Sequence, residues 1–171
     1  MQAHPRRLRD GRGRRPSRAE YASLSRYALT RDDRLTAFPM DDQPLPELLV
    51  ACLCADWCGT CRDYRTGFEA LARVWPHAGF HWVDIEDDAD WLGDLDVENF
   101  PTLLIQRGEL VLFFGTLLPQ HVFLQRTLET FAAFDDEEAR TYAFANEERR
   151  AWQRDCNFRA ALQRRSAGHD A

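Results

Sequence analysis

The sequence predicts an α/β fold: a mixed central sheet of about four strands flanked by helices. Short apolar runs of strand length alternate with segments whose apolar residues recur at helical spacing. The order is strand, helix, strand, short helix, strand, strand, helix. The first two strands, joined by a helix, are expected to be parallel, and the last two, joined by a tight turn, antiparallel. A content of 44% hydrophobic and 12% aromatic residues in 171 is sufficient for one core.

The first strand and the first helix have the clearest patterns. Leu48–Cys54 is an uninterrupted apolar run, typical of a strand covered on both faces. Arg62–Trp75 has apolar residues at spacings of three and four, although Gly67 weakens it, and Pro76–Gly79 is expected to end it. The other expected strands are Phe80–Ile85, Leu103–Gln106 and Leu110–Phe114, and the other expected helices are Glu86–Leu95 and residues 119–134.

Three regions differ in composition. Residues 1–34 hold 10 Arg and 4 acidic residues, whereas residues 35–171 hold 12 Arg and 24 acidic residues. The first region is expected to be a basic, largely disordered arm with a short helix near residues 19–29. A solvated tail is favoured over nucleic-acid contact, so no nucleic-acid partner is expected. Residues 135–171 are expected to form a helical extension, with one helix over about Asp136–Arg165 that packs on the core.

The sequence also bears on location. No apolar run approaches the length of a transmembrane helix, so no membrane contact is expected. The basic start, MQAHPRRLRDGRGRRP, is not followed by the apolar segment of a secretory signal, and a cytoplasmic protein is expected. Because cytoplasmic thiols are kept reduced, the five cysteines are expected to be catalytic, metal-binding or buried rather than a disulfide framework.

Cys58 and Cys61 are the candidate chemical centre. They are separated by two residues and lie between the first strand and the first helix, a placement that indicates a redox dithiol. Unsatisfied backbone N–H groups at a helix N-terminus favour the thiolate form of Cys58. Cys61, one turn further along, is close enough to bridge it. The Cys58 thiolate would attack a substrate disulfide, and Cys61 would then resolve the mixed disulfide.

These residues carry a family resemblance. Trp57-Cys58-Gly59-Thr60-Cys61 resembles the active-site motif WCGPC of the thioredoxin family, with Thr60 in the Pro position. Phe100-Pro101-Thr102, with Pro101 43 residues beyond Cys58, resembles the family's cis-proline segment. Further similarities are Val83–Glu86 to the second core strand, Arg107–Glu109 to the hairpin turn and Gly115 to the groove glycine. The resemblance covers about Pro46–Phe134 and implies a thioredoxin-like fold for residues 35–134.

The resemblance implies a role for each motif residue. Cys58 would be the nucleophile, Cys61 the resolving thiol, and Pro101 a cis residue beside the two sulfurs. The protein would be a protein-disulfide reductase of cell redox homeostasis, with the redox-active Cys58–Cys61 disulfide and no cofactor. Its partners would be disulfide-containing proteins and a thiol or reductase that donates electrons. The substrate groove would be formed by Trp57, Gly59, Thr60, Phe100, Pro101, Thr102 and Gly115.

Two buried residues of the family are replaced. Thioredoxins carry a buried acid six residues before the first cysteine, thought to help deprotonate the resolving thiol, and that position here is Cys52. Its Lys partner corresponds to Trp82, and the aromatic residue two positions after the acid corresponds to Cys54. Cys52 and Cys54 share one face of a strand, which would look toward the dithiol. They are expected to be small buried residues that modulate the site, with a redox relay through Cys52 as the alternative. A slow resolving step is expected.

Two other functions are compatible with the pattern. A thioredoxin-fold binding or co-chaperone module would use the groove with little turnover. The cysteines at 52, 54, 58 and 61 could instead bind zinc, but structural zinc sites pair two separated cysteine knuckles, so no metal is expected. The acids of residues 84–98 lack the regular calcium-binding loop, and no glycine-rich phosphate loop is present.

Overall fold

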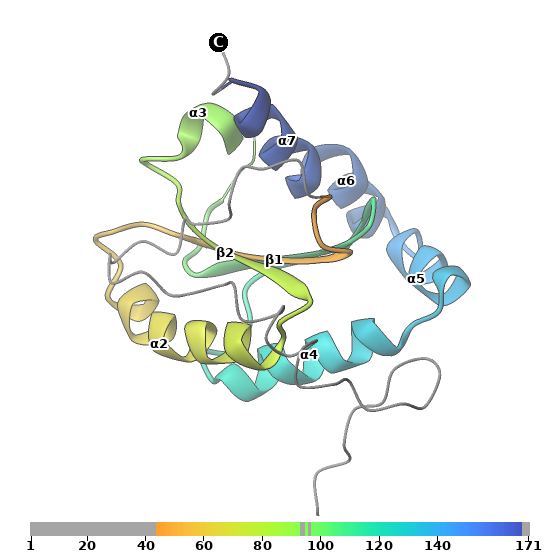
Figure 1. Cartoon of the computed structure of the whole chain (residues 1–171), viewed down its shortest axis with the longest axis horizontal. Coiled ribbons are helices and arrows are strands. Elements are labelled where there is room, and N and C mark those ends of the chain that lie inside the picture. Colours follow the sequence, from red (N-terminus) through yellow and green to blue (C-terminus); the bar gives the residue numbers. More distant parts are fainter. Residues whose placement is uncertain (1–43, 93–94, 96, 169–171) are drawn as a thin grey trace, which may run out of the picture. The chain divides into compact units, whose positions relative to one another are not determined.

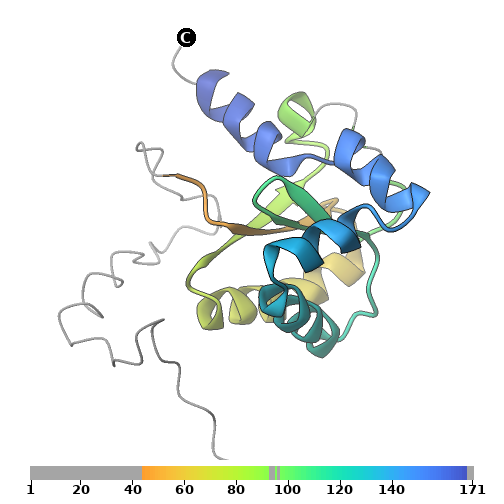
Figure 2. The same ribbon diagram turned by 90° about the vertical axis from the view of Figure 1, so that its right-hand side faces the viewer.

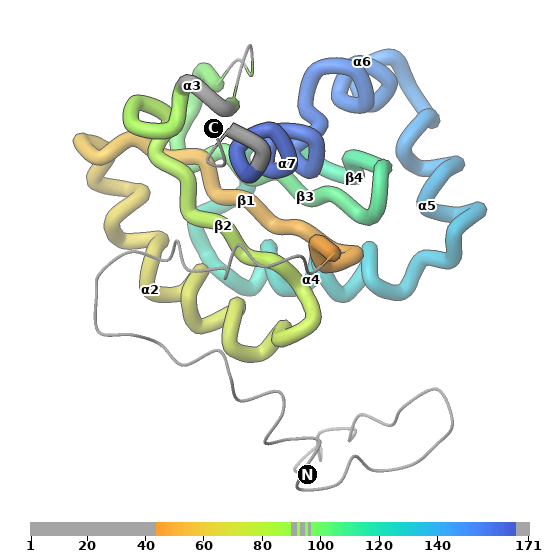
Figure 3. The backbone as a smooth tube through the Cα atoms, turned by 45° about the horizontal axis from the view of Figure 1, so that its top comes forward, coloured from red at the N-terminus to blue at the C-terminus, as the bar shows by residue number. Residues whose placement is uncertain are grey.

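The fold is built around one central strand. The computed structural model describes residues 44–92, 95 and 97–168, so the arm predicted for residues 1–34 lies outside the described part. Strand β1 (Leu48–Cys54) pairs in parallel with β2 (Ala78–Asp84) and antiparallel with β3 (Thr102–Arg107). β4 (Leu110–Gly115) pairs antiparallel with β3, which gives the order β2-β1-β3-β4 seen in Figure 3. The predicted mixed sheet is confirmed.

Helices cover both faces of this sheet. α2 (Gly59–Val74) and α4 (His121–Ala133) lie on one face (Figure 1). α3 (Ala89–Leu92) and α7 (Phe158–Gly168) lie on the other face, as the turned view also shows (Figure 2). α5 (Asp136–Ala143) and α6 (Glu147–Asp155) pack beside β4 at the edge of the sheet.

The alternation of side chains along β1 sets the two cores. Every residue from Leu49 to Cys54 is at most 1% exposed, as expected for a strand covered on both faces. Leu49, Ala51 and Leu53 pack with Phe158 and Leu162 of α7. Val50, Cys52 and Cys54 belong to the core that also holds Phe68 of α2 and Leu128 of α4. Cys52 and Cys54 therefore lie on the same side of the sheet as the helix that follows Cys58.

Several element ends differ from the predicted ones. α2 begins at Gly59, three residues before the predicted start, because Cys58 is its N-cap. β2 begins at Ala78, inside the segment predicted only to end the preceding helix. Of the helix predicted for Glu86–Leu95, Ala89–Leu92 is helical, and residues 93 and 94 are not described.

The single helix predicted for Asp136–Arg165 is wrong, because the structure has three helices there. Two asparagines begin new helical turns. The Asn146 side-chain oxygen accepts from the Arg149 N–H at 2.9 Å, and the Asn157 side-chain oxygen accepts from the Ala160 N–H at 3.0 Å. Asparagine is a preferred N-cap residue because such a bond satisfies a backbone donor that has no partner within the helix. The chain thus changes direction twice and stays against the sheet.

Gln153 of α6 protects the outer edge of β4. Its side-chain oxygen accepts from the Val111 N–H at 2.9 Å, and its Nε2 donates to the Val111 carbonyl at 2.8 Å. The backbone groups of an edge strand can otherwise pair with another chain. One amide side chain therefore takes the place of a further strand at this position.

Arg159 fastens α7 to the beginning of β1. It is 9% exposed, and its guanidinium donates to the carbonyls of Leu45, Pro46 and Glu47 and to that of Gly108 in the β3–β4 turn. One side chain thus donates to four carbonyls; those of Glu47 and Gly108 also accept from the Gly108 N–H and the Gln106 side chain. The prediction that the C-terminal segment packs on the core is confirmed.

Replacing Arg159 with Lys is expected to reduce the free energy of unfolding by about 2–4 kcal/mol, because a compact ammonium cannot reach all four carbonyls and several charge-assisted hydrogen bonds are lost. Urea unfolding followed by tryptophan fluorescence measures the loss. Arg164→Lys changes an exposed residue of the same helix and is expected to cost less than about 0.5 kcal/mol. Equal losses for the two variants would contradict this role of Arg159.

Candidate redox site

Cys58 stands at the start of α2, directly after the turn that follows β1. Its N–H donates to the Ala55 carbonyl at 2.9 Å, which closes the turn. Its Sγ accepts a hydrogen bond from the Cys61 N–H at 3.4 Å. A thiolate accepts such a hydrogen bond more strongly than a thiol does, because charge-assisted bonds are the stronger ones. The backbone of α2 therefore presents a donor to the sulfur.

The two cysteines of the motif differ in exposure. Cys58 is half-buried, whereas Cys61 is 2% exposed. Burial raises the pKa of the Cys61 thiol, and hydrogen bonds with the Cys54 and Cys58 thiols raise it further. The site therefore has an outer sulfur that solvent can reach and an inner sulfur that stays protonated near neutral pH. This difference suits the two roles expected for a nucleophile and a resolving thiol.

Aromatic side chains flank Cys58. Trp57 is 65% exposed, and its ring meets that of Phe100 edge-on with centroids 5.5 Å apart. The Trp57 Nε1 donates to a carboxylate oxygen of Glu86 at 3.2 Å, which orients the indole. Phe100 packs against the same core as Cys58, and the peptide bond between Phe100 and Pro101 is cis. Trp57 and Phe100, 43 residues apart in the sequence, thus meet beside Cys58.

The other predicted groove residues differ in exposure. Gly59 and Thr60 are exposed at the first turn of α2. Pro101 and Thr102 are buried, and the Thr102 hydroxyl donates to the Asn99 carbonyl at 2.7 Å, so these two contribute little exposed side chain. Gly115, half-buried, ends β4 opposite Leu103, and its φ of +148° is one that residues with a Cβ rarely adopt.

Cys52 and Cys54 lie behind Cys61. Their sulfurs are 3.6 Å apart, and both residues share a buried core with Cys61. The hydrogen bond with Cys52, followed by burial, raises the pKa of Cys54. Trp82 pairs with Cys52 across the β1–β2 ladder. The positions that the resemblance assigns to a buried acid and its Lys partner therefore hold a thiol and an indole.

The sequence did not point to His121, which packs against α2. Its ring stacks on Tyr64 at a centroid distance of 4.7 Å, and its Nε2 lies 2.9 Å from the Tyr64 carbonyl oxygen. A Cβ at Gly67 would lie 2.1 Å from the imidazole. Gly67, which looked only unfavourable for the helix, therefore makes room for the ring. An isolated glycine inside a helical pattern was the available signal.

Tyr64 is buried in the same core as Cys52 and Cys54. Within the described residues, its hydroxyl is buried and has no hydrogen-bond partner. Burial raises the pKa of Tyr64, and negative charge on Cys52 or Cys54 would raise it further. The core that holds the two cysteines of β1 therefore also contains a phenol donor.

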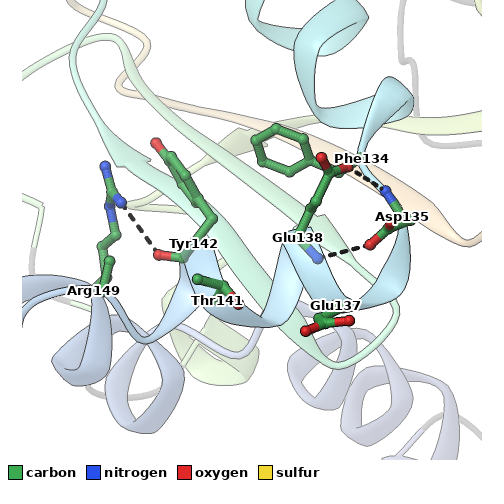
Figure 4. A pocket seen from close by; sticks show the side chains of 8 residues that line it. Phe134, Asp135, Glu137, Glu138, Thr141, Tyr142 and Arg149 are labelled. Atoms are coloured by element: carbon green, nitrogen blue, oxygen red, sulfur yellow. Dashed lines mark hydrogen bonds between the residues drawn. The ribbon is translucent and has the colours of Figure 1, made fainter.

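A pocket of about 490 Å³ lies around α5, apart from these residues (Figure 4). Asp135 and Glu138 form reciprocal side-chain to backbone bonds that begin α5. The Arg149 guanidinium lies 3.6 Å from the centre of the Tyr142 ring and donates to the Tyr142 carbonyl. None of the cysteines lines this pocket, so it is not part of the dithiol site.

The described residues contain neither a metal-binding cluster nor a membrane-spanning helix. In the described part of the chain, no group of three or more His, Cys, Asp or Glu side chains is arranged to hold a metal ion, and the cysteines of residues 52–61 form no such group. No helix among the same residues is long and apolar enough to cross a membrane.

Part of the chain is similar to a known protein family. A family model described as Thioredoxin matches residues 42–116, which include the four strands, α2 and α3. Residues 42–116 are thus similar to the thioredoxin family. The helices α4 to α7, which complete the two cores of the fold, lie beyond the match.

Individual thioredoxins are similar to parts of the chain. A thioredoxin H-type of Fagopyrum esculentum is 36% identical over 59 residues, or 34% of this chain and 51% of that protein. Putative thioredoxin 2 of Streptomyces coelicolor is 30% identical over 59 residues, or 34% of this chain and 44% of that protein. The chain spans about half the length of these curated relatives. Among solved structures, Fasciola hepatica thioredoxin has 24% identity and a TM-score of 0.46, covering 50% of this chain and 82% of that chain.

Proposed function

We propose that the protein is a thiol–disulfide oxidoreductase that reduces protein disulfides through Cys58 and Cys61. The observation that carries this proposal is the pairing of a half-buried Cys58 sulfur at the start of α2 with a buried Cys61 whose N–H donates to it. The family of the domain and the names of its relatives support the same chemistry. The natural setting we propose is the cytoplasm, where thiol and reductase electron donors are available.

In the first step, the Cys58 thiolate attacks one sulfur of a substrate disulfide. The substrate S–S bond breaks, a bond forms between Cys58 and the attacked sulfur, and the other substrate sulfur leaves as a thiolate that takes up a proton. The exposed Trp57 ring and its neighbour Phe100 border the sulfur, so an extended substrate segment would contact both.

In the second step, Cys61 loses its proton and attacks the Cys58 sulfur. The mixed disulfide breaks, the substrate leaves with its second thiol, and a Cys58–Cys61 disulfide remains. Two electrons have then passed from the dithiol to the substrate. An external thiol or reductase must return them before another cycle, and no bound cofactor is needed.

A second candidate function is a binding or co-chaperone module with little turnover. It is favoured by one observation: Cys52 occupies the position of the buried acid, so that carboxylate is not available to accept the proton of Cys61. Such a module would still use the surface around Trp57 and Phe100, without a dithiol cycle.

Reduction of insulin disulfides distinguishes the two functions. The full chain, supplied with dithiothreitol, is expected to accelerate insulin precipitation, and Cys58→Ser is expected to reduce the rate to that of dithiothreitol alone, because the attacking sulfur is gone. Cys156→Ala removes a buried cysteine outside the motif and is expected to keep the activity. A wild-type rate no higher than that of Cys58→Ser would favour the binding module.

The resolving step is expected to be slow at neutral pH and to accelerate with rising pH, because burial raises the pKa of Cys61 and only its thiolate attacks. Below that pKa, each pH unit should increase the rate about tenfold, since the thiolate fraction rises in proportion. The second release of thionitrobenzoate after reaction with Ellman's reagent, followed by stopped flow, reports this step.

Cys52→Asp restores a carboxylate behind Cys61 and is expected to accelerate the resolving step at pH 7 by about tenfold or more, as a general base does. Cys52→Asn has nearly the same shape without the charge and is expected to show no acceleration. A resolving rate independent of pH in the wild type, or equal rates for the two variants, would show that deprotonation of Cys61 is not limiting.

A further inference from the structure

Four sulfurs form a series from the surface of the site into the core. Cys58 is half-buried, Cys61 is 2% exposed, Cys54 is 1% exposed and Cys52 is fully buried. Cys52, Cys54 and Cys61 belong to one buried core and Cys58 packs against it. The Cys61 N–H donates to the Cys58 sulfur at 3.4 Å, the Cys54 sulfur lies 3.6 Å from that of Cys52, and interaction with the Cys54 thiol contributes to the raised pKa of Cys61. The dithiol cycle uses only Cys58 and Cys61, so two further thiols lie in the core behind its disulfide.

Cys61 has two sulfur neighbours on different elements. Cys58 belongs to the first turn of α2, and Cys54 is the last residue of β1. Cys54 lies where the strand gives way to the turn, so a small movement there disturbs less of the sheet than one at Cys52, which pairs with both β2 and β3. Of the two buried cysteines, Cys54 is therefore the one placed to react with Cys61.

A direct Cys52–Cys54 disulfide is disfavoured by the strand itself. Residues two apart in an extended strand have Cα atoms about 6.6–6.8 Å apart, at the upper limit of about 6.8 Å for a disulfide. Cys52 and its neighbours on β1 are held on both sides by ladders with β2 and β3, so the strand has little freedom to shorten that distance. Cys54 and Cys61 lie on separate elements and are not constrained in this way.

We propose that Cys54 is a third redox thiol of this site, which exchanges with the Cys58–Cys61 disulfide to give a Cys54–Cys61 disulfide and a free Cys58. The inference rests on the proposed dithiol function. The Cys54 thiol loses its proton, its sulfur bonds to the Cys61 sulfur, and the Cys58–Cys61 bond breaks. Cys58 leaves as a thiolate, and the proton passes to it or to solvent. Reactants and products of the exchange each contain one disulfide and one thiol, so no external oxidant or reductant is consumed.

Hydrogen-bond donors favour both the departing Cys58 thiolate and the attacking Cys54 thiolate. The Cys61 N–H that donates to the Cys58 sulfur stabilises the departing thiolate. On the other side, the Tyr64 hydroxyl, which has no partner among the described residues, is a donor within the core that holds Cys54. The oxidised protein would then still carry a substrate-facing thiol at Cys58.

Disulfide mapping of the oxidised full chain tests the proposal. The reduced protein is oxidised with diamide, quenched in acid, alkylated with N-ethylmaleimide and digested without reduction. Cleavage before Asp42, Asp56 and Asp63 releases residues 42–55, which contain Cys52 and Cys54, and residues 56–62, which contain Cys58 and Cys61. We expect a disulfide-linked pair of these two peptides with the maleimide on Cys58, beside peptide 56–62 that is closed by its own disulfide.

Two matched variants assign the sulfur that forms the link. Cys54→Ala is expected to abolish the linked pair and leave only the Cys58–Cys61 disulfide, whereas Cys52→Ala is expected to retain it. Both replace a buried cysteine with a small apolar residue, and circular dichroism checks the fold. The connectivity of the wild-type protein decides the question even if one variant does not fold.

The remaining outcomes overturn the proposal in distinguishable ways. A Cys58–Cys61 disulfide as the sole product would refute a third redox thiol and leave the dithiol function intact. A disulfide within peptide 42–55, or a linked pair that persists in Cys54→Ala, would refute the assigned role of Cys54. The absence of any disulfide involving Cys58 or Cys61 would refute the proposed function together with this inference.

Discussion

The burial of β1 on both faces is the constraint on which the other features depend. The strand is central in the sheet and pairs with β2 on one side and β3 on the other, so its register is fixed along its whole length. A shift by one residue would exchange its two faces and move Cys52 and Cys54 away from α2. The strand also delivers the chain to the turn at Ala55, where Cys58 begins α2. The chemistry of the site therefore follows from the packing of a seven-residue apolar run.

The C-terminal helices pack on the same sheet, although they lie beyond the family match. Gln106, fully buried in β3, donates to Asn157 and accepts from the Arg159 N–H, which ties the sheet to the start of α7. Phe158 and Leu162 complete the core on that face of β1. These helices stabilise the strand that positions the site.

Much of the fold could be predicted from the sequence, because its signals are local. The apolar run of β1, the turn at Gly108 and the spacing between Cys58 and Pro101 each depend on a few neighbouring residues. The breaks at Asn146 and Asn157 were missed because the weak apolar stripe continues across them, while the caps depend on single side chains. The contact between His121 and Tyr64 joins residues 57 positions apart. The one sequence feature that could indicate it is Gly67, which makes room for the imidazole.

The two halves of the site differ in character. The outer half has a solvent-accessible sulfur, an exposed Trp57 and a backbone donor from Cys61. The inner half holds Cys52 where the resemblance assigns a carboxylate, and burial together with the neighbouring thiols raises the pKa of Cys61. The central claim is that Cys58 attacks and Cys61 resolves. Trapping tests it most directly: with a disulfide substrate, Cys61→Ser should accumulate a mixed disulfide on Cys58, and Cys58→Ser should accumulate none. Adducts in both variants, or in neither, would contradict the account.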